Sequence, residues 1–142
     1  MDIGTVNAER IVNVGSAANL YSLYSTATTL MGRQGRKVML GLDFLGSGSC
    51  EAKNCAQAAR QLVKINKELA KHSPNDAVWD IDHPNILAPW AGHLAPTITS
   101  CADLYTTSEG ELLLPELISL LQHAELAKQG VVANLADRKS VV

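Results

Sequence analysis

The residues best suited to chemistry gather in one proline-rich stretch of the chain, DIDHPNILAPWAGH, which runs from Asp80 to His93. Two carboxylates, Asp80 and Asp82, come just before His83, and His93 ends the stretch. Carboxylate oxygens combined with imidazole nitrogens suit a divalent ion such as manganese or zinc. An Asp-x-Asp-His-Pro sequence also forms ordinary turns, in which the Asp side chains accept hydrogen bonds from nearby backbone amides. The stretch therefore has two interpretations, a metal- or ligand-binding loop and a structural turn.

The cysteines give little support to nucleophilic catalysis. Cys101 could pair with His93 or His123, since a nucleophile needs a base within reach, but the sequence does not bring these side chains together. Cys50 and Cys55 lack the two-residue spacing of a zinc knuckle. Three cysteines are an odd number, and no basic and apolar leader is recognisable, so we expect reduced thiols in a cytoplasmic protein. We predict no enzymatic activity and no cofactor.

A Gly-Ser-Gly-Ser run, Gly46–Ser49, follows the mainly apolar segment Lys37–Leu45. If residues 38–45 form a short strand, this run resembles a glycine-rich loop that binds phosphate at the start of a helix. The Lys-Ser/Thr of a Walker loop and the third glycine of a dinucleotide loop are both missing. A flexible turn is the favoured interpretation, and residues 38–45 are open between strand and helix because so short an apolar run has no diagnostic period.

The stretch Ile11–Gly32 carries no charged residue over 22 positions. We predict a helix capped by Asn7 that ends at Met31, with Gly32 as its terminating residue. Its many hydroxyl and amide side chains make it too polar for a membrane span. Small residues recur along it at helical spacing and would let a second backbone approach closely, either within the chain or from another subunit. This predicted self-association ridge consists of Gly15, Ala18, Ser22, Ser25 and Thr29.

Charge is segregated along the chain, although the formal net charge is only −2. Residues 33–71 contain eight Lys or Arg, and residues 73–127 contain eight Asp or Glu with no Lys or Arg. We expect the two halves either to fold against each other or to meet head to tail between molecules. The chain as a whole is acidic, so nucleic acid is not an expected partner. The basic residues form one exposed line on a predicted helix over 50–72, which would be the charge-complementary face: Arg60, Lys64, Lys67 and Lys71.

The rest of the chain divides into a long loop and a final helix. A Pro- and Trp-rich loop is predicted at about 73–96, followed by a short helix over Thr97–Tyr105. A last main helix should start near Pro115, because proline is favoured in the first turn, and should end at Gly130.

Together these patterns predict a mainly α fold, a single helical domain over residues 1–142, built as a bundle of three long helices with one or two short ones. The favoured function is a non-enzymatic structural or assembly protein that associates with itself through the uncharged helix. Two alternatives are a small ligand- or metal-binding protein that uses the 80–93 loop, and a soluble regulator or immunity-type partner of another protein. The expected partner is a second copy or another protein, with no membrane span.

Overall fold

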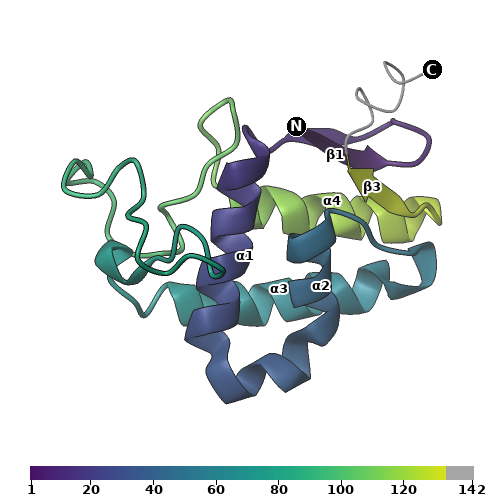
Figure 1. The fold of residues 1–142 in the computed structure, drawn as a ribbon. Helices are drawn as coiled ribbons and strands as arrows, with labels where there is room; N and C mark the ends of the chain where they lie inside the picture. Colours follow the sequence, from purple (N-terminus) through teal and green to yellow (C-terminus); the bar gives the residue numbers. More distant parts are fainter. Residues whose placement is uncertain (134–142) are drawn as a thin grey trace.

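Helices make up most of the ordered structure in the computed structural model, which describes residues 1–133 (Figure 1). The mainly α prediction is confirmed, since three long helices of 15 residues each account for much of the fold. Shorter helices and a small sheet complete it. The helices are α1 (Ala17–Met31), α2 (Met39–Ser47), α3 (Cys55–Leu69) and α4 (Leu113–Ala127), with 3-10 helices η1 (Gly32–Val38), η2 (Ala52–Asn54) and η3 (Pro74–Asp76).

A three-stranded antiparallel sheet brings the start of the chain beside residues 131–133. Strand β1 (Asp2–Thr5) lies in the centre, between β2 (Ile11–Asn13) and β3 (Val131–Ala133). Ile3 is paired with a residue of each neighbour and is fully buried. Figure 1 shows this sheet over α4 and the upper end of α1. Residues 134–142 lie outside the described part of the chain.

The first helix begins later than the sequence pattern indicated. Asn7 does not cap it; its side chain instead accepts hydrogen bonds from Thr5 and Glu9 in the turn between β1 and β2. The true N-cap is Ser16, whose hydroxyl accepts from the amide of Asn19. Residues ahead of Ser16 pair as a strand because the sheet supplies partners that a local pattern does not reveal. The predicted C-terminal glycine, Gly32, is confirmed with φ 52°.

Helix α3 forms as its 3.6-residue period predicted, but it covers Cys55–Leu69 and is shorter at both ends than the predicted 50–72. Its apolar face, which includes Leu62, Ile65 and Leu69, is fully buried, mainly against α4 and α2. Helix α2 can approach closely because of Gly41, where a β-carbon would lie only 3.1 Å from Ile65 Cδ1. The amide of Gly41 donates to Gln61 of α3 across this contact.

The possible strand at 38–45 is wrong: this segment is the end of η1 and most of α2. Gly46–Ser49 consequently lies at the C-terminal end of a helix, where carbonyl groups rather than amides are left free, so it lacks the geometry of a phosphate loop. Gly48 takes the left-handed conformation that ends α2, with φ 73°. A β-carbon there would be 2.8 Å from that of Ala133, so the close packing of β3 also requires glycine.

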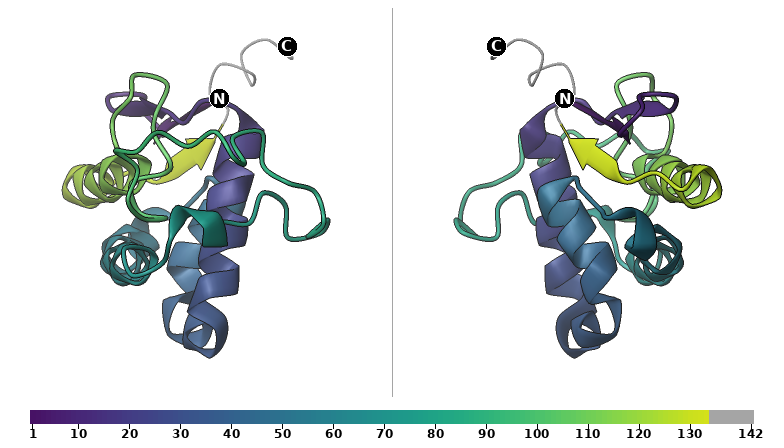
Figure 2. Two further views of the ribbon diagram at one scale, coloured as in Figure 1. Left: turned by 90° about the vertical axis from the view of Figure 1, so that its left-hand side faces the viewer. Right: turned by 90° about the vertical axis from the view of Figure 1, so that its right-hand side faces the viewer.

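The Pro/Trp-rich loop is confirmed and extends to Leu112, without a helix over Thr97–Tyr105. Two contacts replace the helix. The carboxylate of Asp103 accepts from the amides of Thr99 and Ser100. The amide of Cys101 donates to the carbonyl of His72 instead of to a carbonyl within the segment. Figure 2 shows that part of this loop extends outward beside α1. Among residues 1–133, no helix is long and apolar enough to cross a membrane.

Candidate functional site

Hydroxyl groups on α1 hold the loop in place. Ser22 and Thr26 both donate to the carbonyl oxygen of Val78, at 2.9 and 3.1 Å, and Thr26 accepts from the amide of Val78 at 2.8 Å. The phenol oxygen of Tyr105 lies 2.8 Å from each of the two hydroxyls. Backbone amide and carbonyl groups that are removed from water need other hydrogen-bond partners, and these α1 side chains supply them at Val78. The network therefore explains why α1 is polar yet uncharged.

Two further α1 side chains contact the same loop. Ser25 accepts from the amide of Ile81 at 3.1 Å, and the Tyr21 hydroxyl donates to a carboxylate oxygen of Asp82. The hydrogen bond to Asp82 raises the pKa of Tyr21 to about 12. Each turn of α1 that faces the loop thus contributes a polar contact.

The residues predicted as a self-association ridge consequently divide into two groups. Ser22 and Ser25 are fully buried and make their contacts within the chain, so they are not free to meet another subunit. Ala18 and Thr29 are exposed, and the half-buried Gly15 lies before the N-cap Ser16, outside the helix. The ridge is interrupted because the loop covers its centre.

An aromatic group forms the floor of a cavity in the loop. The ring centroids of Trp79 and Trp90 are 5.2 Å apart, and those of Trp90 and Tyr105 are 5.9 Å apart, both in edge-to-face geometry. Such pairs are favourable beyond the area they bury, so they stabilise this arrangement of the floor. The cavity has a volume of about 330 Å³. We call the residues around it the Trp-loop surface: Val78, Trp79, Ile86, Leu87, Trp90 and Leu94.

Two aliphatic side chains of the Trp-loop surface point into solvent. Ile86 is 54% exposed and Leu87 is 78% exposed. A single exposed aliphatic residue is ordinary, but two adjacent ones beside an aromatic cavity form a contiguous apolar patch. A concave apolar floor with protruding aliphatic residues is a common arrangement at protein interfaces.

The predicted metal ligands form a turn next to this surface. Asp80 accepts from the amide of Asp82 at 2.9 Å, and its other oxygen lies 3.1 Å from Nδ1 of His83. Burial acts against ionisation of Asp80, but the hydrogen bonds from His83 and Asp82 outweigh it and lower the pKa of the carboxyl. His93 takes part in a separate turn, through its amide to Trp90. In residues 1–133, no three His, Cys, Asp or Glu side chains are grouped to hold a metal ion.

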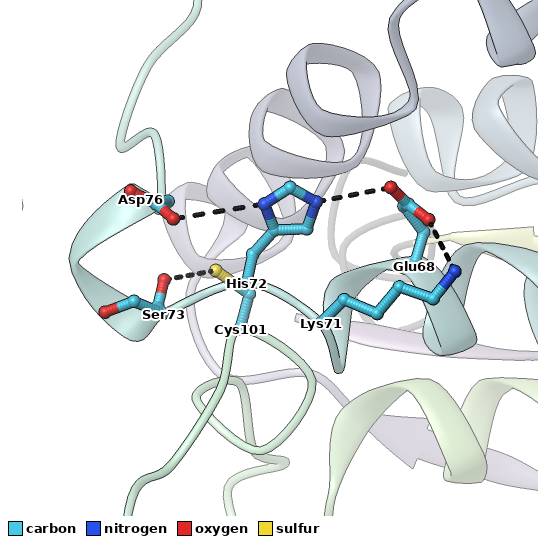
Figure 3. Close-up of polar contacts among 6 residues, drawn as sticks. All are labelled: Glu68, Lys71, His72, Ser73, Asp76 and Cys101. Carbon is cyan, nitrogen blue, oxygen red and sulfur yellow. Dashed lines mark hydrogen bonds and ion pairs between the residues drawn. The ribbon is translucent and has the colours of Figure 1, made fainter.

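A second polar cluster lies where α3 meets the loop (Figure 3). Nε2 of His72 is 3.3 Å from Glu68, and its Nδ1 is 3.9 Å from Asp76. The thiol of Cys101 donates to the carbonyl of Ser73 at 3.1 Å. Burial, together with Asp76 and a second nearby carboxylate, raises the pKa of this thiol to about 11. Cys101 is therefore protonated at neutral pH and serves to join the loop to α3, not as a nucleophile.

The basic residues of α3 lie on its outer face. Lys71, two residues beyond the end of the helix, is 3.4 Å from the half-buried Glu68 in its last turn. The structure thus places the predicted basic line as an exposed set, separate from the uncharged face of α1: Arg60, Lys64, Lys67 and Lys71.

The sequence pattern missed the residues that build the cavity and its support. Nothing local marks Tyr105 as the partner of α1 hydroxyls that are about 80 residues away. The adjacent Ile86 and Leu87 were the one available signal, because two large aliphatic residues in a Pro-rich loop with no strand or helix period have no evident core to enter.

Comparison with known proteins identifies a family. A family model described as immunity protein 70 matches residues 5–132, which is most of the chain. The chain has no significant match among curated proteins or among solved structures. An immunity family indicates a non-enzymatic protein with a protein partner. The match supports the third prediction from the sequence, an immunity-type partner of another protein, in preference to self-association.

Proposed function

Because this chain belongs to the immunity protein 70 family, we propose that it binds a protein toxin and blocks the toxin's action in the cell that makes both. The Trp-loop surface is the part of the chain that contacts the toxin. The protein acts by occupying a surface of its partner, so inhibition follows the stoichiometry of the complex.

The observation that carries this assignment is the preorganised apolar patch in the loop. Exposed Ile86 and Leu87 lie beside a cavity whose floor is fixed by Trp79 and Trp90. Aromatic residues and a desolvated centre dominate the energy of many interfaces. A rigid surface also loses little conformational entropy when a partner binds. Loops held on a rigid scaffold commonly carry recognition, and here α1 supplies the scaffold.

The chemistry near the loop agrees with binding rather than turnover. The buried Cys101 thiol has a raised pKa and a backbone partner, and Asp80 is engaged with its own turn. These groups hold the loop in shape. A shape held in this way presents the same surface before and after a partner arrives.

The test has two stages. First, the chain is immobilised and used to capture proteins from a lysate of its source organism, and the captured protein is identified by mass spectrometry. Second, that protein is expressed alone and with the chain. We expect expression alone to arrest growth and co-expression to restore it. A captured protein that is harmless, or whose toxicity the chain does not relieve, would overturn the proposal.

A matched pair of variants assigns the surface. Leu87→Ser removes an aliphatic side chain that is 78% exposed in the loop, and Leu126→Ser removes one that is 85% exposed on α4. Truncating a hot-spot residue near the centre of an interface weakens binding by about 10-fold or more. We expect that loss for Leu87→Ser and no change for Leu126→Ser. The reverse pattern would place the toxin on α4 instead.

A further inference from the structure

Three aspartates lie in the segment that carries the Trp-loop surface, and the nearest Lys or Arg before them in sequence, Lys71, is paired with Glu68. Asp76, Asp80 and Asp82 all come from the loop segment that lines or flanks the cavity. The segment 73–127 has no basic side chain except histidine, and α1, which supports the loop, has no charged residue at all. The negative potential at this surface is therefore not cancelled by its own scaffold.

The carboxylates themselves have no strong cationic partner among residues 1–133. Asp76 and Asp80 form ion pairs only with His72 and His83, at 3.9 and 3.1 Å. Asp82 accepts from a neutral phenol, that of Tyr21. A hydrogen bond from a phenol leaves the negative charge of Asp82 in place, so this carboxylate can still attract a cation.

We propose that the partner presents a Lys- or Arg-rich surface to this loop, with an apolar side chain that enters the cavity between Trp79 and Leu87. The inference rests on the proposed function and specifies the chemistry of the toxin that would be bound. Basic side chains of the toxin contact the rim formed by Asp76, Asp80 and Asp82. The apolar side chain supplies the desolvated centre of the contact, and the charged rim orients the two molecules as they approach.

Charge complementarity of this kind acts mainly on the rate of association and on its salt dependence. Attraction between exposed charges is screened over about 8–10 Å at physiological ionic strength. Affinity for the toxin should therefore fall as salt rises. The apolar contact does not share this dependence, which allows the two contributions to be measured separately.

The experiment adds positive charge to the rim without disturbing the aspartate turns. Asn75 and Asn85 are exposed on the same loop, and Gln34 and Gln57 are exposed on η1 and α3. The double variant Asn75→Lys/Asn85→Lys is compared with the control Gln34→Lys/Gln57→Lys, which makes the same change in net charge. Binding of the captured toxin is measured at about 0.05 M and about 0.5 M NaCl, which spans weak to strong screening.

We expect the loop variant to raise the Kd about 10-fold or more at low salt, chiefly through a slower association rate. The difference should shrink to about threefold or less at high salt, and the control should stay within about twofold of the wild-type protein. Asp82→Asn is the complementary test, because it removes a negative charge from the rim while the amide oxygen can still accept a hydrogen bond from Tyr21. It should weaken binding in the same salt-dependent way.

The outcomes are distinguishable. If a toxin binds and is neutralised, but its Kd changes neither with salt nor in the loop variant, the proposed function stands. The proposal that the partner's surface is rich in Lys or Arg is then wrong. If no toxin is captured or relieved, both proposals fail. If the free chain instead forms dimers that Lys64→Glu/Lys67→Glu and the loop variant each dissociate, the cationic partner is a second copy of this chain, and the toxin surface proposed here is wrong.

Discussion

Helix α3 and the Trp loop carry charge of opposite sign, but they reach their conformations by different routes. Helix α3 has an apolar face at helical spacing, so its own residues specify both its conformation and the side it buries. The loop has no period, and its backbone at Val78 is held by Ser22 and Thr26 of α1. The basic line therefore lies along a helix whose conformation its own sequence specifies. The acidic recognition surface lies on a loop whose conformation depends on tertiary contacts.

This difference predicts which substitutions should alter partner binding and which should have little effect. Segments with few regular backbone hydrogen bonds open at lower free energy than core helices, and binding loops are commonly of this kind. A change that weakens the α1–loop network should alter binding before it alters the helices. A change on the outer face of α3 should alter neither.

Tyr105→Ala should have the largest effect, because this side chain is buried and links α1 to the aromatic floor. Removing a buried aromatic ring typically costs about 3–5 kcal/mol of unfolding free energy. Tyr105→Phe keeps the ring and should cost about 1 kcal/mol, the contribution of a typical hydrogen bond. Chemical denaturation followed by tryptophan fluorescence measures both. Equal losses for the two variants would show that the ring is not the principal contact.

Thr26→Val should have the next largest effect. Valine has nearly the shape of threonine but leaves the amide of Val78 without its 2.8 Å acceptor, and an unsatisfied buried group costs about 1–3 kcal/mol. Thr29→Val changes an exposed position on the same helix and serves as the control. We expect faster amide exchange at Val78 in the first variant only. Protection that is unchanged at Val78 would mean that the loop backbone has another partner.

Asp103→Asn should have a smaller, pH-dependent effect on the end of the loop. Burial of Asp103 opposes ionisation, but the hydrogen bonds from Ser100 and Thr99 outweigh it and lower the pKa of the carboxyl in the folded protein. The stabilisation is therefore present above the unfolded pKa of about 3.9 and is lost as the pH falls through the lower folded pKa. Asp103→Asn should melt below the wild-type protein at neutral pH. The two melting temperatures should converge in acid, and a constant difference would contradict this account.

Lys64→Glu/Lys67→Glu should have the smallest effect. Both side chains are exposed on α3, and surface substitutions of this kind usually change stability by less than about 0.5 kcal/mol. We expect unchanged melting, unchanged sedimentation at low and high salt, and full binding of the toxin. Loss of binding in this variant would move the recognition surface from the loop to α3.

Much of the scaffold could be predicted from the sequence alone. The period of α3, the glycine that ends α1 and the prolines of the loop each act locally, through spacing or through a backbone constraint, so three long helices and the loop follow from them. The segregation of charge also follows directly from the order of residues. These features need no knowledge of what lies across the core.

Only the tertiary structure decided the features that depend on residues far apart in the chain. Residues 2–5 are a strand because residues 11–13 and 131–133 pair with them, and the helix over residues 39–47 packs closely on α3 because Gly41 leaves room for Ile65. Likewise, the Ser22 hydroxyl forms its hydrogen bonds within the chain and not with another subunit, because the fold places Tyr105 and Val78 beside it. In each case the deciding partner is distant in sequence, and a short segment is compatible with several conformations until that partner is in place.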